Sequence, residues 1–139
     1  MLIKAFKVAY KAHKGQKDKA GKPYILHPVY VAMHTKGVKR KTVALLHDIV
    51  EDTKITLEDL KQMEFDKEIV EAVRCITKIK GEDYSEYLQR VKSNEIAKDV
   101  KLADLKHNCN LGRLGDNVTR KDYMRVNKYR CAICTLTAD

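Results

Sequence analysis

The stretch that most constrains the fold reads ALLHDIVEDT and runs from Ala44 to Thr53. Its apolar residues recur at helical spacing, which predicts a buried helix from about Lys41 to Glu51. Four ionisable side chains interrupt this apolar pattern, and they are His47, Asp48, Glu51 and Asp52. Because residues three and four apart share one face of a helix, the four groups are expected to gather in one patch. Burying several carboxylates costs free energy unless a cation or hydrogen bonds compensate them, and a divalent metal is the simplest compensation.

A helix that turns acidic where it reaches solvent would explain the same stretch without a metal, so other parts of the chain must decide. Asp104 lies in the middle of another apolar helix, predicted from about Ile96 to Asn108, and a solvent-facing helix surface does not explain it. His27 precedes Pro28 at the start of a further predicted helix, where the missing N–H of proline costs nothing. This entrance suits a metal ligand and a simple cap equally well.

Four polar residues on an apolar background therefore stand out, and they come from three predicted helices: His27, His47, Asp48 and Asp104. Two imidazoles and two carboxylates suit a metal such as Mn²⁺ and leave coordination positions open for water and substrate. His13, on the inner edge of the first predicted helix, is expected to play a structural role in the core rather than to bind the metal.

The rest of the chain also predicts helices, because no segment shows the sustained alternation of a strand. The predicted fold class is all-α, with residues 1–139 forming a single domain whose helices pack around the one from Lys41 to Glu51. Residues 56–59 resemble a capping box at the start of a short helix, and the last helix is predicted from Thr119 to Leu136. Large side chains expected on the buried faces of helices include Phe6, Tyr10, Met33 and Tyr123.

Hydrophobic residues make up 44% of the chain and charged residues 34%, which is typical of a globular protein in water. Lysines interrupt residues 1–15, so neither a secretory signal nor a membrane-spanning helix is predicted, and the cytoplasm is the expected location. The cysteines do not suggest a disulfide framework. Cys131 and Cys134 are expected to be buried free thiols rather than zinc ligands, because no second such pair accompanies them.

The net charge of +9 is unevenly distributed along the chain. Residues 1–41 contain eleven Lys or Arg and a single acid, Asp18, whereas residues 42–71 contain nine acids and three lysines. A basic segment beside an acidic motif suits a metal centre that receives a polyanionic small molecule, although a nucleic-acid-binding face would carry the same charge. Three lysines in one loop are free to contact phosphates or to stay solvated, namely Lys17, Lys19 and Lys22.

The two-His, two-Asp set matches the H…HD…D pattern of the HD-domain metal-dependent phosphohydrolases. Within that group the chain resembles the hydrolase domain of the RelA/SpoT-homologue family. With no room for a synthetase domain, it looks like the stand-alone small alarmone hydrolases. The resemblance covers nearly the whole chain and rests on four ordered motifs: HxGQ at 13–16, AGKPYIxHP at 20–28, LLHDxxEDT at 45–53 and VKLADxxHN at 100–108.

The resemblance implies an Mn²⁺ ion held by His27, His47, Asp48 and Asp104. It also implies that Glu51 and Asp52 orient or deprotonate the attacking water and that Asn108 contacts the nucleotide sugar. The implied reaction removes pyrophosphate from the 3′ position of guanosine tetra- or pentaphosphate and leaves GDP or GTP. The remaining phosphates would be neutralised by Lys17, Lys19 and Lys22.

Two departures from the family pattern concern the base. Larger members place Arg-Lys before the small residue and glycine of the first loop, where this chain has Asp18-Lys19-Ala20-Gly21. Their motif Asp is followed by Arg-Leu, whereas Asp104 is followed by Leu105 and Lys106. Guanine preference is therefore open. Two alternatives concern the substrate, namely an adenosine alarmone or another 3′-phosphorylated nucleotide. A third is that the protein is a catalytically silent HD-fold module that binds RNA or a nucleotide. Self-association is also open, whereas nucleic acid and a membrane are not the expected partners.

Overall fold

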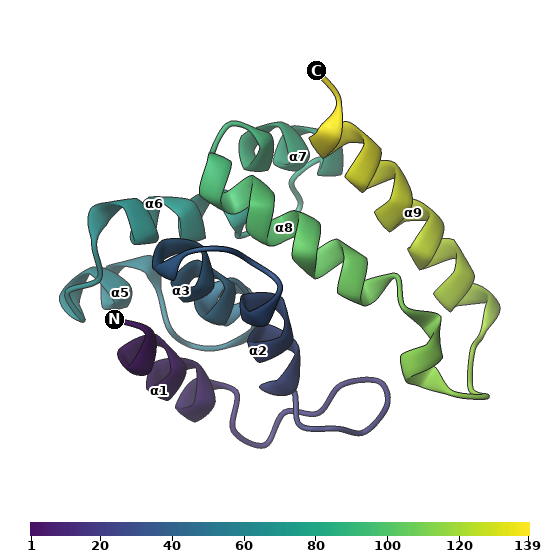
Figure 1. Ribbon diagram of the computed structural model, residues 1–139, viewed down its shortest axis with the longest axis horizontal. Helices are drawn as coiled ribbons and strands as arrows, with labels where there is room; N and C mark the ends of the chain where they lie inside the picture. Colours follow the sequence, from purple (N-terminus) through teal and green to yellow (C-terminus); the bar gives the residue numbers. More distant parts are fainter.

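The computed structural model describes all 139 residues and is built from helices. No strand is present apart from an isolated antiparallel bridge between Lys17 and Pro23, so the predicted all-α class is confirmed (Figure 1). The helices are α1 (Leu2–Ala12), α2 (Leu26–Met33), α3 (Val38–Leu46), α4 (Ile49–Asp52), α5 (Leu57–Gln62), α6 (Lys67–Ile76), α7 (Tyr84–Lys92), α8 (Glu95–Asn108), the 3₁₀ helix η1 (Leu111–Leu114) and α9 (Arg120–Thr137).

Helices α3 and α8 occupy the centre of the fold, and most other helices pack against one or both of them (Figure 1). Helix α3 contacts α1, α2, α6 and α8, while α8 also contacts α7 and α9. A core of 25 buried apolar residues joins these two helices to the others, and it includes Val43, Leu46, Ile69 and Leu105. The prediction that the other helices pack around the one from Lys41 to Glu51 is therefore right for its first part, α3, but α8 shares this central place.

Side-chain caps fix the starts of several helices. Thr56 accepts a hydrogen bond from the backbone N–H of Asp59, and the Asp59 carboxylate accepts one in return, which confirms the predicted capping box of α5. Thr119 and Asp122 form the same arrangement at the start of α9. Such caps stabilise a helix by about 1 kcal/mol each, because they satisfy N–H groups that the helix itself leaves without partners.

The predicted helix from Lys41 to Glu51 is wrong in one respect, because α3 ends at Leu46 and a separate helical turn, α4, begins at Ile49. Asp48 lies between them with φ of −102° and ψ of 0°, outside regular helical geometry. The apolar spacing continues through this break, so periodicity does not reveal it. As a result, His47 and Asp48 lie at a junction between two helices rather than on the face of a straight one.

Several predicted burials are also wrong. Phe6 is 42% exposed, Tyr10 53%, Met33 72% and Tyr123 58%. Helices α1 and α9 lie at the edge of the fold (Figure 1), so the core covers only one face of each and their apolar stripes extend past it. Phe6 and Tyr10 instead stack on each other, with ring centroids 5.9 Å apart. Cys131 and Cys134 are exposed free thiols on α9, for the same reason, whereas Cys75 is buried.

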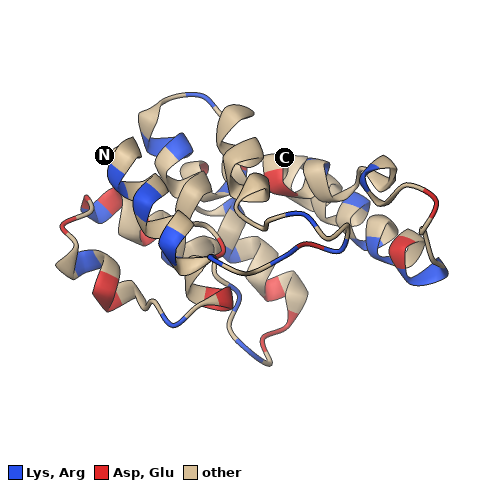
Figure 2. Ribbon diagram, turned by 90° about the horizontal axis from the view of Figure 1, so that it is seen from below, with Lys and Arg blue, Asp and Glu red and all other residues tan.

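Lys and Arg residues occur on many helices and loops rather than on a single element (Figure 2). The basic residues of positions 1–41 lie on α1, in the loop between α1 and α2, and on α3 and the turn before it. None of the helices combines the length and the hydropathy that crossing a bilayer would require.

Candidate functional site

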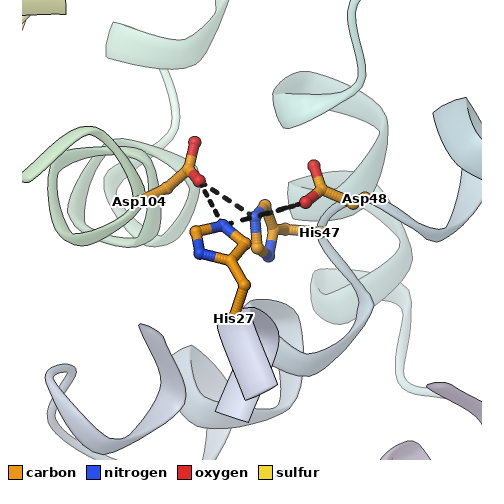
Figure 3. Close-up of side chains that lie close together, drawn as sticks. All are labelled: His27, His47, Asp48 and Asp104. Atoms are coloured by element: carbon orange, nitrogen blue, oxygen red, sulfur yellow. Dashed lines mark hydrogen bonds and ion pairs between the residues drawn. The ribbon is translucent and has the colours of Figure 1, made fainter. Parts of the chain in front are cut away.

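Three parts of the chain bring four side chains together, and these are His27 of α2, Asp104 of α8, and His47 and Asp48 at the α3–α4 junction (Figure 3). One donor atom of each lies within 4.8 Å of the others. Nε2 of His27 is 2.7 Å from Oδ1 of Asp104, while Nε2 of His47 is 3.0 Å from Oδ2 of Asp48. His27, His47 and Asp104 are each at most 4% exposed. The four residues that stand out in the sequence thus form one buried donor set that could hold a divalent metal.

The end of α3 sets the orientation of His47. Its Nδ1–H donates to the carbonyl oxygen of Ala44, 2.6 Å away, and Nε2 is left facing Asp48 and Asp104. Burial alone would lower the pKa of His47, but the two carboxylates raise it well above the usual value. When no metal is bound, a proton on His47 therefore balances part of the carboxylate charge.

Asp104 is held from several sides. Its Oδ2 accepts a hydrogen bond from Nζ of Lys101 at 3.0 Å, and Oδ1 accepts one from Nδ2 of Asn108 at 3.1 Å. Burial alone would raise the pKa of Asp104, but Lys101 and the imidazoles of His27 and His47 bring it well below the usual range. The carboxylate is therefore ionised and fixed in position near neutral pH.

Tyr24 connects the loop between α1 and α2 to the cluster. Its hydroxyl donates a hydrogen bond to Oδ2 of Asp48. Burial and the charge of Asp48 together raise the pKa of Tyr24, so its hydroxyl keeps its proton. Burial alone would raise the pKa of Asp48, but His47 outweighs that effect and the pKa is lowered.

His107 lies behind His27 as seen from the cluster, because the Nδ1 atoms of the two rings are 2.7 Å apart while Nε2 of His27 faces Asp104. Burial, Arg113 and His27 lower the pKa of His107 to about 4. Its ring is therefore neutral near neutral pH.

Glu51 and Asp52 lie on α4, but their carboxylates are not members of the four-residue cluster. Oε1 of Glu51 accepts a hydrogen bond from the backbone N–H of Lys78. The backbone oxygen of Asp52, rather than its carboxylate, accepts a hydrogen bond from Nε2 of Gln16 at 3.1 Å. Both residues are exposed, but partial removal of solvent around their carboxyl groups raises the pKa of each. The negative charge of Asp48 adds to the effect, although the Lys78 N–H opposes it in Glu51. A raised pKa suits a carboxylate that has to accept a proton.

A cavity of about 300 Å³ adjoins the cluster and has His27 and Tyr24 in its wall. Its other walls come from the loop after α1, the end of α8, the segment around η1, and α9. Asn108 is one of the polar lining residues. The cationic lining residues are Lys17, Lys19, Arg113 and Arg125. The structure thus places Lys17, Lys19 and Asn108 around one cavity, whereas Lys22 does not line it.

Asp18, the residue that departs from the family pattern, organises this wall of the cavity. Its Oδ1 accepts hydrogen bonds from the backbone N–H groups of Ala20 and Lys22, both at 2.9 Å. Its Oδ2 lies 3.5 Å from Nη2 of Arg113, which also donates through Nη1 to the carbonyl oxygen of His107 at 3.4 Å. Asp18 therefore holds a guanidinium group from a distant part of the chain at the cavity wall.

Several residues of the site had no assigned role in the sequence analysis. Tyr24, Lys101 and His107 belong to the motifs at 20–28 and 100–108, so the available signal was their place within those motifs. Arg113 gave no such signal, because its pairing with Asp18 spans 95 residues. His13 is buried outside the cluster, with Nδ1 2.9 Å from Oε1 of Gln16, whereas its Nε2 has no hydrogen-bond partner within the protein.

The chain is similar to known proteins in both sequence and fold. A profile of the HD domain family matches residues 5–107. The bifunctional (p)ppGpp synthase/hydrolase SpoT of Escherichia coli is 33% identical over 136 residues, which cover 86% of this chain and 19% of SpoT. A probable guanosine-3′,5′-bis(diphosphate) 3′-pyrophosphohydrolase of Synechocystis is 36% identical over 123 residues, which cover 78% of this chain and 16% of that protein. The chain therefore spans less than a fifth of the length of these relatives.

A solved structure extends the comparison to the fold. It is described as a metazoan orthologue of SpoT that hydrolyses ppGpp, and it aligns with a TM-score of 0.78 over 99% of this chain and 85% of its own. At 24% sequence identity, this likeness shows a shared fold. Because the family profile covers most of the chain, this protein belongs to the HD domain family.

Proposed function

We propose that this protein is an Mn²⁺-dependent phosphohydrolase that removes pyrophosphate from the 3′ position of guanosine tetra- or pentaphosphate and leaves GDP or GTP. The observation that carries the proposal is that a buried two-His, two-Asp cluster shares His27 with a cavity lined by cations. The names of the relatives concern (p)ppGpp synthesis and hydrolysis, and they support this substrate class.

The donor set fits a borderline divalent ion, because it combines two imidazole nitrogens with two carboxylates. The proposed ligands are His27, His47, Asp48 and Asp104. Ligand orientation is already set in part, since His47 is fixed by Ala44 and Asp104 by Lys101. When bound, such an ion supplies positive charge for the phosphoryl oxygens and makes a water molecule easier to deprotonate.

Glu51 and Asp52 are the proposed acceptors of the proton from the attacking water. Both lie within one turn of Asp48, and both have a raised pKa, so each holds a proton more readily than an ordinary surface carboxylate. The bond from the Lys78 N–H fixes Oε1 of Glu51 and leaves the second oxygen of that carboxylate for the water. Asp52 acts as its partner in orienting the water.

The cations of the cavity are proposed to bind the phosphates that are not hydrolysed. Lys17, Lys19 and Arg125 supply charge, and the pairing of Arg125 with Asp122 at 2.6 Å keeps its side chain in place. Asn108 is proposed to contact the sugar, and its hydrogen bond to Asp104 ties that contact to the cluster. Lys22, which does not line the cavity, would attract the anion only from a distance.

Arg113 is proposed to pack against the base. Its guanidinium is held by Asp18 and by the carbonyl oxygen of His107, and a planar cation held at its edge can stack on an aromatic ring. Arg113 would thereby take the role of the loop arginine that larger members of the family carry at the position of Asp18. Stacking by itself distinguishes guanine from adenine poorly, because every base has a π face. An adenosine alarmone is therefore the second candidate substrate.

The decisive experiment is an Mn²⁺-supplemented assay on a panel of guanosine and adenosine 3′-pyrophosphates, with the products identified by mass spectrometry. Pyrophosphate and GDP or GTP are the expected products, and the Asp104→Asn variant should form neither. If the wild-type protein binds Mn²⁺ but hydrolyses no member of the panel, the catalytically silent nucleotide-binding module is the better description. We further propose that residues 1–139 act as one hydrolase domain, since one core joins α1 to α9, and that the protein works in the cytoplasm.

A further inference from the structure

His107 is a buried imidazole that makes a direct hydrogen bond to a proposed metal ligand. It lies on α8, three residues after Asp104, and is 8% exposed. Its Nδ1 is 2.7 Å from Nδ1 of His27, and the two ring planes are inclined by only 11° with centroids 4.9 Å apart. No carboxylate or carbonyl oxygen takes this place, so the partner of His27 is a second histidine.

The hydrogen-bond pattern of His27 restricts where its proton lies. Nε2 faces the cluster, 2.7 Å from Oδ1 of Asp104. An imidazole that offers the lone pair of Nε2 to a metal must carry its proton on Nδ1. His27 is only 4% exposed, so that N–H needs an acceptor within the protein. Nδ1 of His107 is the atom in reach, and to accept it must carry its own proton on Nε2.

We propose that His107 is a positioning residue, which accepts a hydrogen bond from Nδ1–H of His27 and thereby holds the tautomer and ring orientation with which His27 binds a divalent metal. This inference rests on the proposed function, because it requires that the cluster binds a metal. Partners of metal-bound imidazoles act in this way in general, and their loss typically weakens metal binding by about 10- to 100-fold.

A column of stacked rings holds His107 in turn. The ring of Tyr30 lies 3.7 Å from that of His107 with an angle of 18° between the planes, and the ring of His34 lies 4.0 Å from that of Tyr30 with an angle of 20°. His27, Tyr30 and His34 all come from α2 or its C-cap, at intervals of three and four residues, and so share one side of that helix. One helix thus both supplies the metal ligand and clamps the ring that orients it.

A purely structural role would explain the same contacts, because His107 also packs α8 against α2. Two substitutions separate the roles. His107→Phe keeps a flat ring for Tyr30 to stack on but has no acceptor for the His27 N–H. His107→Asn loses the ring but places an amide oxygen near the former position of Nδ1, where it can accept the bond. Tyr30→Phe is the matched control, since it keeps the stacking ring and removes only a hydroxyl.

The first measurement is the Kd for Mn²⁺ by isothermal titration calorimetry, together with the Tm in the presence of a chelator. His107→Phe is expected to weaken Mn²⁺ binding by about 10- to 100-fold, whereas His107→Asn stays within about threefold of wild type and Tyr30→Phe is unchanged. The inference is overturned if His107→Phe binds Mn²⁺ as wild type does. It is equally overturned if the Asn and Phe variants lose affinity in proportion to their loss of Tm, which is the pattern of a packing residue.

The second measurement uses the wild-type protein, so it does not depend on how the variants fold. Long-range ¹H–¹⁵N NMR spectra with Zn²⁺, a diamagnetic substitute for Mn²⁺, report which nitrogen of each of the five histidines carries the proton. His107 is expected in the Nε2–H form and His27 in the Nδ1–H form when the metal is bound. A proton on Nδ1 of His107 in the loaded protein contradicts the inference alone. A wild-type protein that binds neither ion contradicts the proposed function as well.

Discussion

Lys101 and Asp104 form a buried ion pair within one turn of α8, with Nζ 3.0 Å from Oδ2 and side chains 17% and 5% exposed. Burial alone would lower the pKa of Lys101, but Asp104 and Tyr87 raise it well above the usual value, so the lysine stays charged. The two oxygens of Asp104 are thus divided, since Oδ1 faces the imidazoles of the cluster while Oδ2 faces the lysine. Lys101 therefore provides a permanent countercharge for this carboxylate.

Replacing Lys101 by Met is expected to destabilise the metal-free protein by about 3 kcal/mol, because it leaves a buried carboxylate without its cation. The loss should be smaller with saturating Mn²⁺, since a bound cation compensates Asp104 in its place. Urea unfolding with chelator and with Mn²⁺ measures both values. Lys106→Met is the matched control, because Lys106 is exposed on the same helix and should change stability by less than about 0.5 kcal/mol. Equal destabilisation with and without metal would show that Lys101 acts by packing alone.

Glu51→Gln should bind Mn²⁺ almost as wild type does and yet lose about 10²- to 10⁴-fold in kcat, because Gln cannot accept a proton. Asp52→Asn should lose less if Asp52 only helps to orient the water. Metal content and kcat are measured on the same preparations, with Glu58→Gln on α5 as a control for an exposed glutamate outside the site. A Glu51→Gln protein that is purified without manganese would place Glu51 among the ligands. One that retains full kcat would leave Asp52 as the proton acceptor.

Binding of Mn²⁺ should become weaker as the pH falls. Asp48 and Asp104 raise the pKa of His47 well above its usual value in the metal-free protein, and a protonated Nε2 cannot bind a metal. Below that raised pKa each bound ion must displace one proton, so the apparent affinity should fall about tenfold per pH unit. Calorimetry in buffers of different ionisation enthalpy is expected to detect the release of about one proton near pH 7. An affinity that is independent of pH between 6 and 8 would refute this coupling.

Substitutions of the loop lysines should separate by position. Lys17→Ala and Lys19→Ala should raise KM more than they lower kcat, because both residues line the cavity but lie outside the cluster. The effect should shrink at high ionic strength, since charges at the surface are screened over about 8 Å in physiological salt. Lys22→Ala lies in the same loop outside the cavity and serves as the control, with a small change in KM expected. If all three variants behave alike, the loop contributes only general positive charge.

Much of the candidate site was visible in the sequence because its residues break a strong local pattern. His47, Asp48 and Asp104 interrupt apolar helical segments, and such interruptions need a compensating partner wherever the segment is buried. The all-α class follows from the same periodicity, and the capping box at Thr56 and Asp59 follows from residues that contact each other within one turn. These features depend on residues close together in the chain, so a single sequence is enough to predict them.

Only the tertiary structure decided how these residues face one another. The break between α3 and α4, which directs Asp48 toward His47, is invisible to periodicity, because the apolar spacing runs through it. The pairs Arg113 with Asp18 and His107 with His27 join positions 95 and 80 residues apart, and no local rule links them. The exposure of Phe6 and Tyr123 likewise depends on which helices lie at the edge of the fold. An amphipathic stripe in the sequence shows that a helix has an apolar side. How much of that side is buried depends on which helices pack against it.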